Sequence, residues 1–456
     1  MCYYYNNERS LTWIKRTNKQ EVTLFHHHGK KARPTLSRPL QDLTPVAIPK
    51  ALLAESKRLK LLQNITESCA LDSPRFDSLC MKLLHNFTNQ CQSLPETANS
   101  YYALPGGLLD HALNRTEAAL HLLCQQMVPG HDAELSEEQK LWLYALFSAA
   151  ILQGIGKLQL DYRIELFDVN GLFSRLWNPL LEGLASNARY YHYEFTQGSE
   201  DDLRCRLNLL LAYQLMPESG FSWIAGNPQV LAVWLALLNE DPNAAGMLGL
   251  ILERADAIAI QRDLNAFLIR HTASGGGRAN RISTFIDAPE SSIGKEHVLG
   301  AEFIKWLTQQ LEKGRFSINK LPIMMLPAGL HMTIETYKFF MREHPDTRLK
   351  TWQAVHNGLI SLGLHHREAN NHTANPNDKT SQNGIILNKF AVVLPDKMQL
   401  HDPATGKETT VTAIEMMRIQ KSLNNREPLH HLTQSGEWQA VEANTPELQS
   451  GYSRRE

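Results

Sequence analysis

The stretch Phe147–Lys157, which reads FSAAILQGIGK, decides how this chain folds. Upstream of it, Ser136 and Gln139 have the spacing of a capping box, which predicts the start of a helix. Apolar side chains then recur along one helical face, at Leu141, Tyr144, Phe147 and Ile151. Gly154 and Gly156 predict the end of this helix, because glycine is favoured just past a helix C-terminus.

Helical spacing of apolar residues continues on both sides of this stretch and breaks near residue 274. It predicts further helices at 51–68, 75–91, 106–127, 201–216, 227–239, 244–256 and 258–270. In the first of these, Lys57, Arg58 and Lys60 are expected on the polar side. Ser274–Arg278 reads SGGGR and predicts a flexible break, so we place the domain boundary between 273 and 298.

The pattern beyond residue 298 differs and combines helices with short strands. It predicts, in order, a helix, a short strand, two helices and a β run, at 301–313, 315–319, 333–343, 348–362 and 385–394. This order is typical of a winged helix, with Arg348, Lys350 and Arg367 on or just after the candidate recognition helix. A small interaction domain with an ordinary polar helix face also fits. We expect residues 299–400 to fold as a separate unit.

The composition is that of a globular protein with a balanced charge. The chain has 456 residues, with 46 basic against 47 acidic side chains, which excludes a wholesale polyanion-binding surface but not a local one. We expect no membrane span, since no run of about 18 apolar residues occurs. Six cysteines without a CxxC pair favour a reducing, cytoplasmic location. Residues 1–45 are predicted to be a basic, weakly ordered tail, whose His26–His28 tract has no assigned role.

The helix end at Gln153 and Gly154 resembles a metal site from which two ligands are missing. In the HD phosphohydrolase superfamily, the corresponding segment reads apolar-apolar-His-Asp-apolar-Gly-Lys. The resemblance implies that His111 and Asp256 are the remaining, vestigial metal ligands, with Gln153 and Gly154 in place of the His-Asp pair. Two remaining ligands rarely hold a catalytic ion. We therefore expect no cofactor.

Simpler interpretations of these residues stay open. His111 also fits an ordinary hydrogen-bonded helix histidine. Asp256 also fits a surface charge on a helix, and Lys157, a possible catalytic residue, also fits a cation near a helix C-terminus. The chain has no phosphate-binding loop or GxSxG motif, so no nucleotide-driven motor is predicted.

Taken in order, these features resemble the relaxase-type TraI family of integrating conjugative elements and related plasmids. The similar stretches lie within roughly residues 50–400 and are Leu94–Pro95, Gly106–His111, Ala149–Lys157, Trp177–Pro179, Ala255–Leu264 and Gly300–Leu307. The resemblance implies a mainly α fold: an HD-like helical bundle at 46–273, a linker at 274–298, and a small α+β winged-helix-like domain at 299–400. Residues 401–456 are predicted to be a polar tail.

The resemblance also implies a role in DNA processing during conjugative transfer. We expect a relaxase-like accessory protein with an inactive metal site, whose partners are DNA and other conjugation proteins. One alternative is an active metal-dependent nuclease or phosphohydrolase that binds Mn, Fe, Mg or Zn through substitute ligands such as His192. Another is a structural adaptor for other transfer proteins.

Overall fold

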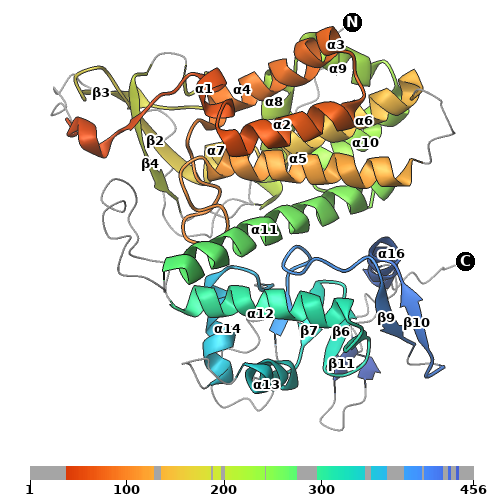
Figure 1. Ribbon diagram of the computed structural model, residues 1–456. Coiled ribbons are helices and arrows are strands. Elements are labelled where there is room, and N and C mark those ends of the chain that lie inside the picture. The colour runs from red at the N-terminus through yellow and green to blue at the C-terminus, as the bar shows by residue number, and fades with distance from the viewer. Residues whose placement is uncertain are drawn as a thin grey trace, which may run out of the picture.

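A computed structural model describes residues 37–127, 135–185, 188–196, 201–241, 243–274, 295–344, 351–366, 385–402, 405–424, 430–432 and 438–440. Figure 1 shows a helical N-terminal part above a smaller C-terminal part of helices and short strands, with helix α11 running between them. The fold is thus mainly α with a small α+β C-terminal part, as the sequence predicts. The division into domains stays a prediction.

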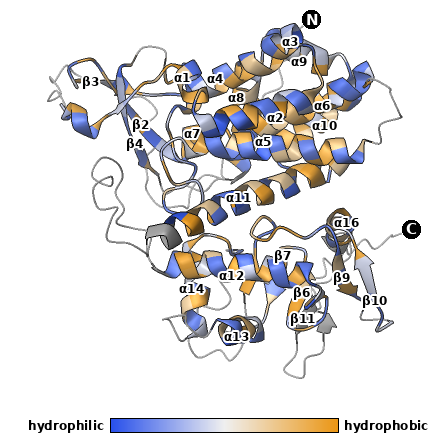
Figure 2. Cartoon of the chain, in the orientation of Figure 1, coloured by the Kyte–Doolittle hydropathy of each residue, from blue (hydrophilic) through white to orange (hydrophobic). Residues whose placement is uncertain are grey.

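The N-terminal part packs its helices around one apolar core, and the orange faces in Figure 2 turn toward that core. Its helices are α1 (Pro49–Leu53), α2 (Ser56–Cys69), α3 (Ser73–Phe76), the π-helical turn η2 (Asp77–Met81), α4 (Lys82–Cys91), α5 (Gly107–Gln126), α6 (Glu137–Leu152), α7 (Lys157–Leu160), α8 (Asp201–Leu215), α9 (Glu218–Ala225) and α10 (Pro228–Leu238), after a 3-10 turn η1 (Leu40–Asp42). The capping box at Ser136 is present.

Helix α6 is apolar on nearly every side because it crosses the middle of the core. All of its residues from Leu143 to Leu152 are buried. By length and composition, Glu137–Leu160 could cross a membrane, as could the bent pair α9 and α10 taken together, but 78% of the apolar 18-residue window within Glu137–Leu160 is buried inside the protein. Burial in the core accounts for this apolar composition.

A four-stranded sheet flanks the bundle in a region where the sequence indicated only short elements. Its strands are β1 (Thr44–Pro45), β2 (Tyr162–Phe167), β3 (Phe173–Leu176) and β4 (Tyr190–Phe195), in the order β1-β4-β2-β3, all antiparallel. Tyr162, Ile164, Leu166 and Tyr191 bury their side chains in the N-terminal core. The sheet therefore belongs to the N-terminal part.

Helix α11 (Gly246–Ser274) is one continuous helix of 29 residues where the sequence pattern predicted two. No proline or glycine interrupts it near Ala257, the residue between the two predicted helices. Leu248, Ile251, Leu252 and Ala255 belong to the N-terminal core. Ile260, Leu264, Phe267 and Leu268 belong to the C-terminal core. The C-terminal core is therefore not confined to residues 299–400.

The C-terminal part contains the predicted helices and strands together with elements that the sequence did not indicate. Its elements are α12 (Lys295–Glu312), β5 (Ser317–Ile318), β6 (Ile323–Leu326), β7 (Gly329–Met332), α13 (Ile334–Glu343), α14 (Trp352–Ser361), β8 (Ile385–Leu387), β9 (Met398–His401), β10 (Glu408–Val411), α16 (Ala413–Asn424), β11 (His430–Leu432) and β12 (Trp438–Ala440). The sheets have the orders β6-β7-β8, β10-β9-β5 and β11-β12. The hairpin β6–β7 and helix α16 are additions to the predicted order, and the predicted β run ends early, at Leu387. The winged-helix assignment stays a prediction.

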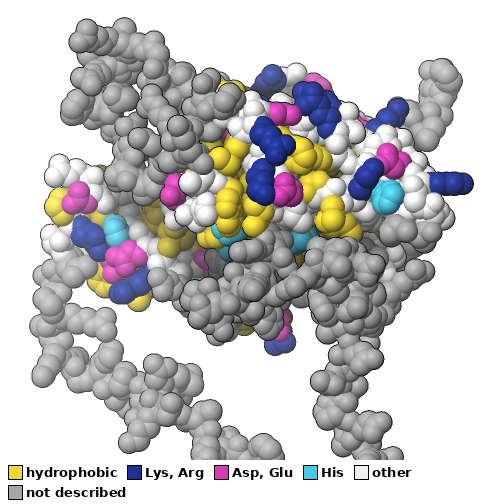
Figure 3. All heavy atoms as spheres, turned by 90° about the horizontal axis from the view of Figure 1, so that it is seen from below, with side chains coloured by type: hydrophobic (Ala, Val, Ile, Leu, Met, Phe, Trp, Pro, Cys, Tyr) yellow, Lys and Arg dark blue, Asp and Glu magenta, His cyan; other side chains and the backbone are white. Residues whose placement is uncertain are grey.

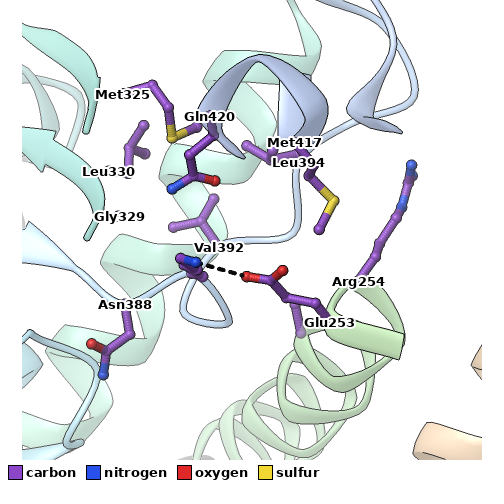
Figure 4. A pocket seen from close by; sticks show the side chains of 12 residues that line it. Glu253, Arg254, Met325, Gly329, Leu330, Asn388, Val392, Leu394, Met417 and Gln420 are labelled. Carbon is purple, nitrogen blue, oxygen red and sulfur yellow. Dashed lines mark ion pairs between the residues drawn. The ribbon is translucent and has the colours of Figure 1, made fainter. Parts of the chain in front are cut away.

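Helix α16 lies within the predicted polar tail and closes the C-terminal part against α11. Ala413 and Met416 are buried in the C-terminal core. Figure 4 shows Gln420 beside the hairpin residues Met325 and Leu330 at a small pocket that Met417 also lines, with Glu253 of α11 at its other side. Helix α16 thus lies between the hairpin β6–β7 and α11.

Candidate functional site

A cavity of about 760 Å³ opens between the N-terminal and C-terminal parts. Its floor comes from α5, α11, the end of α6, the start of α7 and the loop before α5. The opposite wall comes from the β6–β7 turn and the segment after β8. The lining residues with polar side chains that the site uses are Glu96, His111, Arg115, Gln153, Lys157 and Asp256. Elements of the N-terminal part and of the C-terminal part therefore line the same cavity.

His111 lies at the centre of the floor, on the first turns of α5. Its side chain is 4% exposed and its ring stacks on Tyr102, with 4.9 Å between the ring centroids. Nδ1 lies 3.4 Å from Glu96 Oε1, and Nε2 lies 3.0 Å from Asp256 Oδ1. The second contact lacks the geometry of a hydrogen bond, so Nε2 is left without a hydrogen-bond partner. The structure thus brings His111 and Asp256 together.

Two cationic side chains bind the carboxylates on this floor. Arg115, one helical turn after His111, places Nη1 3.1 Å from Asp256 Oδ1. Its Nε donates to the Ala150 carbonyl and its Nη2 to the Gln153 carbonyl, each at 2.9 Å. Lys157 forms an ion pair with Glu96 and donates to the Glu96 carbonyl at 3.2 Å.

The residues present do not fit the four-ligand metal set that the HD resemblance implies. Gln153 caps the end of α6 and uses its carbonyl to accept from Arg115. Gly154 has φ +76°, and a side chain built there would meet no atom within 4 Å. In the described part of the chain, no group of three or more His, Cys, Asp or Glu side chains could hold a metal ion.

The electrostatics follow from this mixture of charges in a buried place. Burial raises the pKa of Glu96, but Lys157 and His111 outweigh it and lower that pKa to about 2. Burial likewise raises the pKa of Asp256, and the charges of His111 and Arg115 hold it well below the usual range. For His111, burial lowers the pKa, and the two carboxylates more than offset this and raise it. The charged forms of Glu96, Asp256 and His111 are therefore favoured.

We expect this network to make stability depend on pH in the acid range. A carboxyl whose folded pKa is lowered stabilises the folded state above its unfolded pKa, and loses this as pH falls through its folded pKa. For Glu96 the window runs from 4.5 down to about 2. The free energy of unfolding should fall there by on the order of 3 kcal/mol for this group alone.

Urea unfolding of the parent and of Glu96→Gln between pH 6 and pH 2 measures this effect, and the variant should show the shallower fall. Glu137→Gln is the matched control. Hydrogen bonds from Arg75 and Lys140 also lower the pKa of Glu137, but on an exposed surface, where solvent weakens the interaction, so this variant should change the pH profile much less than Glu96→Gln. Equal pH profiles for the parent and Glu96→Gln would show that Glu96 does not cause the loss of stability in acid.

The remaining predicted residues either do not line the cavity or lie outside the described residues. His192, the substitute ligand of the enzyme alternative, does not line the cavity; it sits on β4, with Nε2 3.3 Å from Arg38 Nη1. Arg348, Lys350 and Arg367 lie outside the described residues, as does the His26–His28 tract.

Sequence reasoning missed two residues of the floor, Glu96 and Arg115. Glu96 directly follows Leu94–Pro95, one of the stretches similar to the TraI family, but the sequence pattern predicted no role for its carboxylate. Arg115 lies four residues after His111, on the same face of α5, and this spacing could have indicated it.

Two family models match this chain. The family described as "Putative helicase", TraI_2, matches residues 44–283. The family described as "Putative conjugal transfer nickase/helicase TraI C-term", TraI_2_C, matches residues 298–406. No curated protein matches the chain.

Proposed function

Since this chain belongs to the TraI_2 family, whose model covers more than half of it, we propose that it is a cytoplasmic DNA-processing or accessory protein of conjugative transfer that works without a metal-dependent nicking centre. The family match of both parts supports the DNA-processing role. The observation that carries the second half of the proposal is the pairing of Arg115 with Asp256 and of Lys157 with Glu96.

That pairing bears on catalysis because strand cleavage in a metal site needs an ion that lowers the pKa of water and polarises a phosphate. Guanidinium and ammonium groups donate hydrogen bonds but bind no water as a Lewis acid. We therefore propose that the floor holds a strand or a partner segment in place rather than cleaving one.

For the DNA-binding surface we propose Arg348, Lys350 and Arg367, the basic residues that precede and follow α14 in the sequence. The face of the protein seen from below in Figure 3 shows Lys and Arg side chains interspersed with acidic and hydrophobic ones. The described surface on this face is therefore no broad polyanion-binding patch.

We expect the full chain to bind duplex DNA without nicking it. Arg348→Ala together with Lys350→Ala should weaken binding and lower the slope of log affinity against log salt by about two units, if both side chains contact phosphates. Fluorescence anisotropy of a labelled duplex across a salt series gives the slope. Conversion of supercoiled plasmid to open circles, with Mg²⁺ or Mn²⁺ added, reports nicking.

The matched control for this pair is Lys305→Ala with Lys313→Ala, two exposed lysines of the same C-terminal part. This control should keep the parent slope within the error of the measurement. An equal loss in both double variants would indicate a general charge effect. Metal-dependent open circles formed by the parent would contradict the proposed lack of a nicking centre.

A structural adaptor is the second candidate, and one observation favours it. Leu203, Leu210 and Tyr213 form an exposed apolar stripe along α8, and Leu210 and Tyr213 are 60% and 67% exposed. Exposed apolar patches on soluble proteins commonly mark sites of interaction with other proteins. Absence of DNA binding at low salt would favour this candidate.

A further inference from the structure

The floor of the cavity holds two atoms that could share one cation. His111 Nε2 and Asp256 Oδ1 lie 3.0 Å apart, and Nε2 is buried with no hydrogen-bond partner. On the other side of the imidazole, Glu96 Oε1 lies 3.4 Å from Nδ1. A carboxylate behind one ring nitrogen orients the other nitrogen, which is the arrangement found behind metal-binding histidines.

The cation that reaches this place is part of the chain itself. Arg115 Nη1 lies 3.1 Å from Asp256 Oδ1. We infer that the guanidinium of Arg115 holds the place of a divalent cation beside His111 and Asp256, and that this arginine excludes metal ions from the floor.

The charges of the floor are consistent with such a replacement. Glu96 and Asp256 supply two carboxylates, and Lys157 and Arg115 supply two fixed cations that contact them. Arg115 thereby supplies Asp256 with a positive charge of the kind that a bound metal ion would supply. Removing one partner of a buried ion pair leaves an uncompensated charge, which strongly destabilises the folded state. Each carboxylate on the floor therefore needs its cationic partner for the folded state to be stable.

Arg115 is fixed in place rather than free to swing aside. Its side chain is 8% exposed, and it donates to the carbonyls of Ala150 and Gln153 at the end of α6. Carbonyls in the last turn of a helix have no partner within the helix, so Arg115 also completes the hydrogen bonding of α6. An incoming metal ion would have to displace all three contacts.

This position of Arg115 changes what restoring the missing ligand pair would achieve. Gln153→His with Gly154→Asp adds two ligands at the end of α6 but leaves the guanidinium beside Asp256. The left-handed φ of Gly154 is tolerated by aspartate better than by most residues. We therefore expect the double variant to bind Co²⁺ weakly, and the triple variant with Arg115→Gln to bind it at least roughly tenfold more tightly.

The experiment compares Co²⁺ binding by the full-length parent, the double variant and the triple variant. Titration calorimetry gives the affinity, and the visible absorption of bound Co²⁺ reports nitrogen and oxygen ligation without any assay of activity. In the triple variant Co²⁺ should also raise the melting temperature, because a ligand that binds only the folded state stabilises it. The parent should show none of these signals.

The matched control places Arg254→Gln, instead of Arg115→Gln, in the double variant. Arg254 is on the same helix as Asp256, its side chain is 10% exposed, and it pairs with Asp396. This control should bind Co²⁺ no better than the double variant. Equal affinity in the double and triple variants, or no Co²⁺ binding by a folded triple variant, would overturn the inference.

Folding of the variants is measured first, because Arg115→Gln removes three buried contacts. If the triple variant is unfolded without metal, refolding by Co²⁺ supports the inference. Failure to refold with Co²⁺, for both Arg115→Gln and the similarly long but uncharged Arg115→Met, counts against it. The inference rests on the proposed absence of a metal centre, but plasmid nicking and Co²⁺ binding are separate measurements, so each can fail alone.

Discussion

A fragment of residues 295–424 is expected to be unfolded, whereas a fragment of residues 257–424 is expected to fold. The shorter fragment lacks the second half of α11, whose Ile260, Leu264, Phe267 and Leu268 are buried in the C-terminal core. Full burial of such a side chain contributes about 1.5–3 kcal/mol. Four of them contribute about 6–12 kcal/mol, comparable with the roughly 5–15 kcal/mol that stabilises a whole domain.

Far-UV circular dichroism and urea unfolding of the two fragments measure this difference. The expected result is a cooperative transition for residues 257–424 and none for residues 295–424. A related measurement uses the full chain with a protease site inserted between residues 274 and 295. After cleavage, the two pieces should co-elute in size-exclusion chromatography, because α11 remains packed against α12. A cooperative transition in the shorter fragment would show that the C-terminal part is an independent unit.

Replacing Arg58 with leucine is expected to destabilise the protein by about 3–5 kcal/mol, the range for breaking a buried ion pair from one side. The side chain of Arg58 is only 2% exposed. Its Nε donates to Asp110 Oδ1 at 2.7 Å, and Nη1 donates to the Leu52 carbonyl at 2.7 Å and to Glu55 at 2.9 Å. Leucine would leave these acceptors without their donor.

Lys57→Leu is the matched control, because Lys57 contacts the same carboxylate from outside. Its Nζ lies 2.6 Å from Asp110 Oδ2, but its side chain is 59% exposed. Exposed ion pairs contribute about 0–1 kcal/mol. In urea unfolding, Arg58→Leu should therefore lose several-fold more unfolding free energy than Lys57→Leu. Similar losses would show that Arg58 acts as a surface charge.

Arg58 also shows where the sequence pattern was wrong. The helical spacing of 51–68 placed Arg58 with Lys57 and Lys60 on the polar side. The chain between α4 and α5 passes over that side of α2 instead, and Gly106 comes so close that a side chain there would meet Arg58. A helical pattern reports which face is apolar, but it does not report which loop will cover a charged residue.

The elements that the sequence predicted well are those with local signals. The capping box at Ser136, the apolar face of α6 and the glycines after it depend on neighbouring residues, and the structure contains all three. The strands β2 to β4 and the hairpin β6–β7 depend on pairing between segments, which spacing alone does not reveal. The sequence pattern predicted two helices, 244–256 and 258–270, where α11 is continuous, and α11 carries apolar residues on two different faces. In the structure, those faces belong to two different cores.

For the floor of the cavity, motif order found His111 and Asp256 as neighbours although 145 positions separate them in the sequence. Their metal role stays untested. Glu96 and Arg115 were missed for a physical reason. A charged residue in a loop or on a helix is exposed in most proteins. Only the three-dimensional packing reveals that Glu96 and Arg115 are buried, where Glu96 pairs with Lys157 and Arg115 pairs with Asp256.

The continuity of α11 has a mechanical consequence. Ala255 packs in the N-terminal core and Ile260 in the C-terminal core. Asp256 therefore lies where the single helix α11 passes from one core to the other. Rotation of the two parts about that point would require α11 to bend or one core to open, since packed interiors deform little. The width of the cavity is thus set by a stiff helix rather than by a hinge. A bound strand or partner segment would have to fit the opening as it stands.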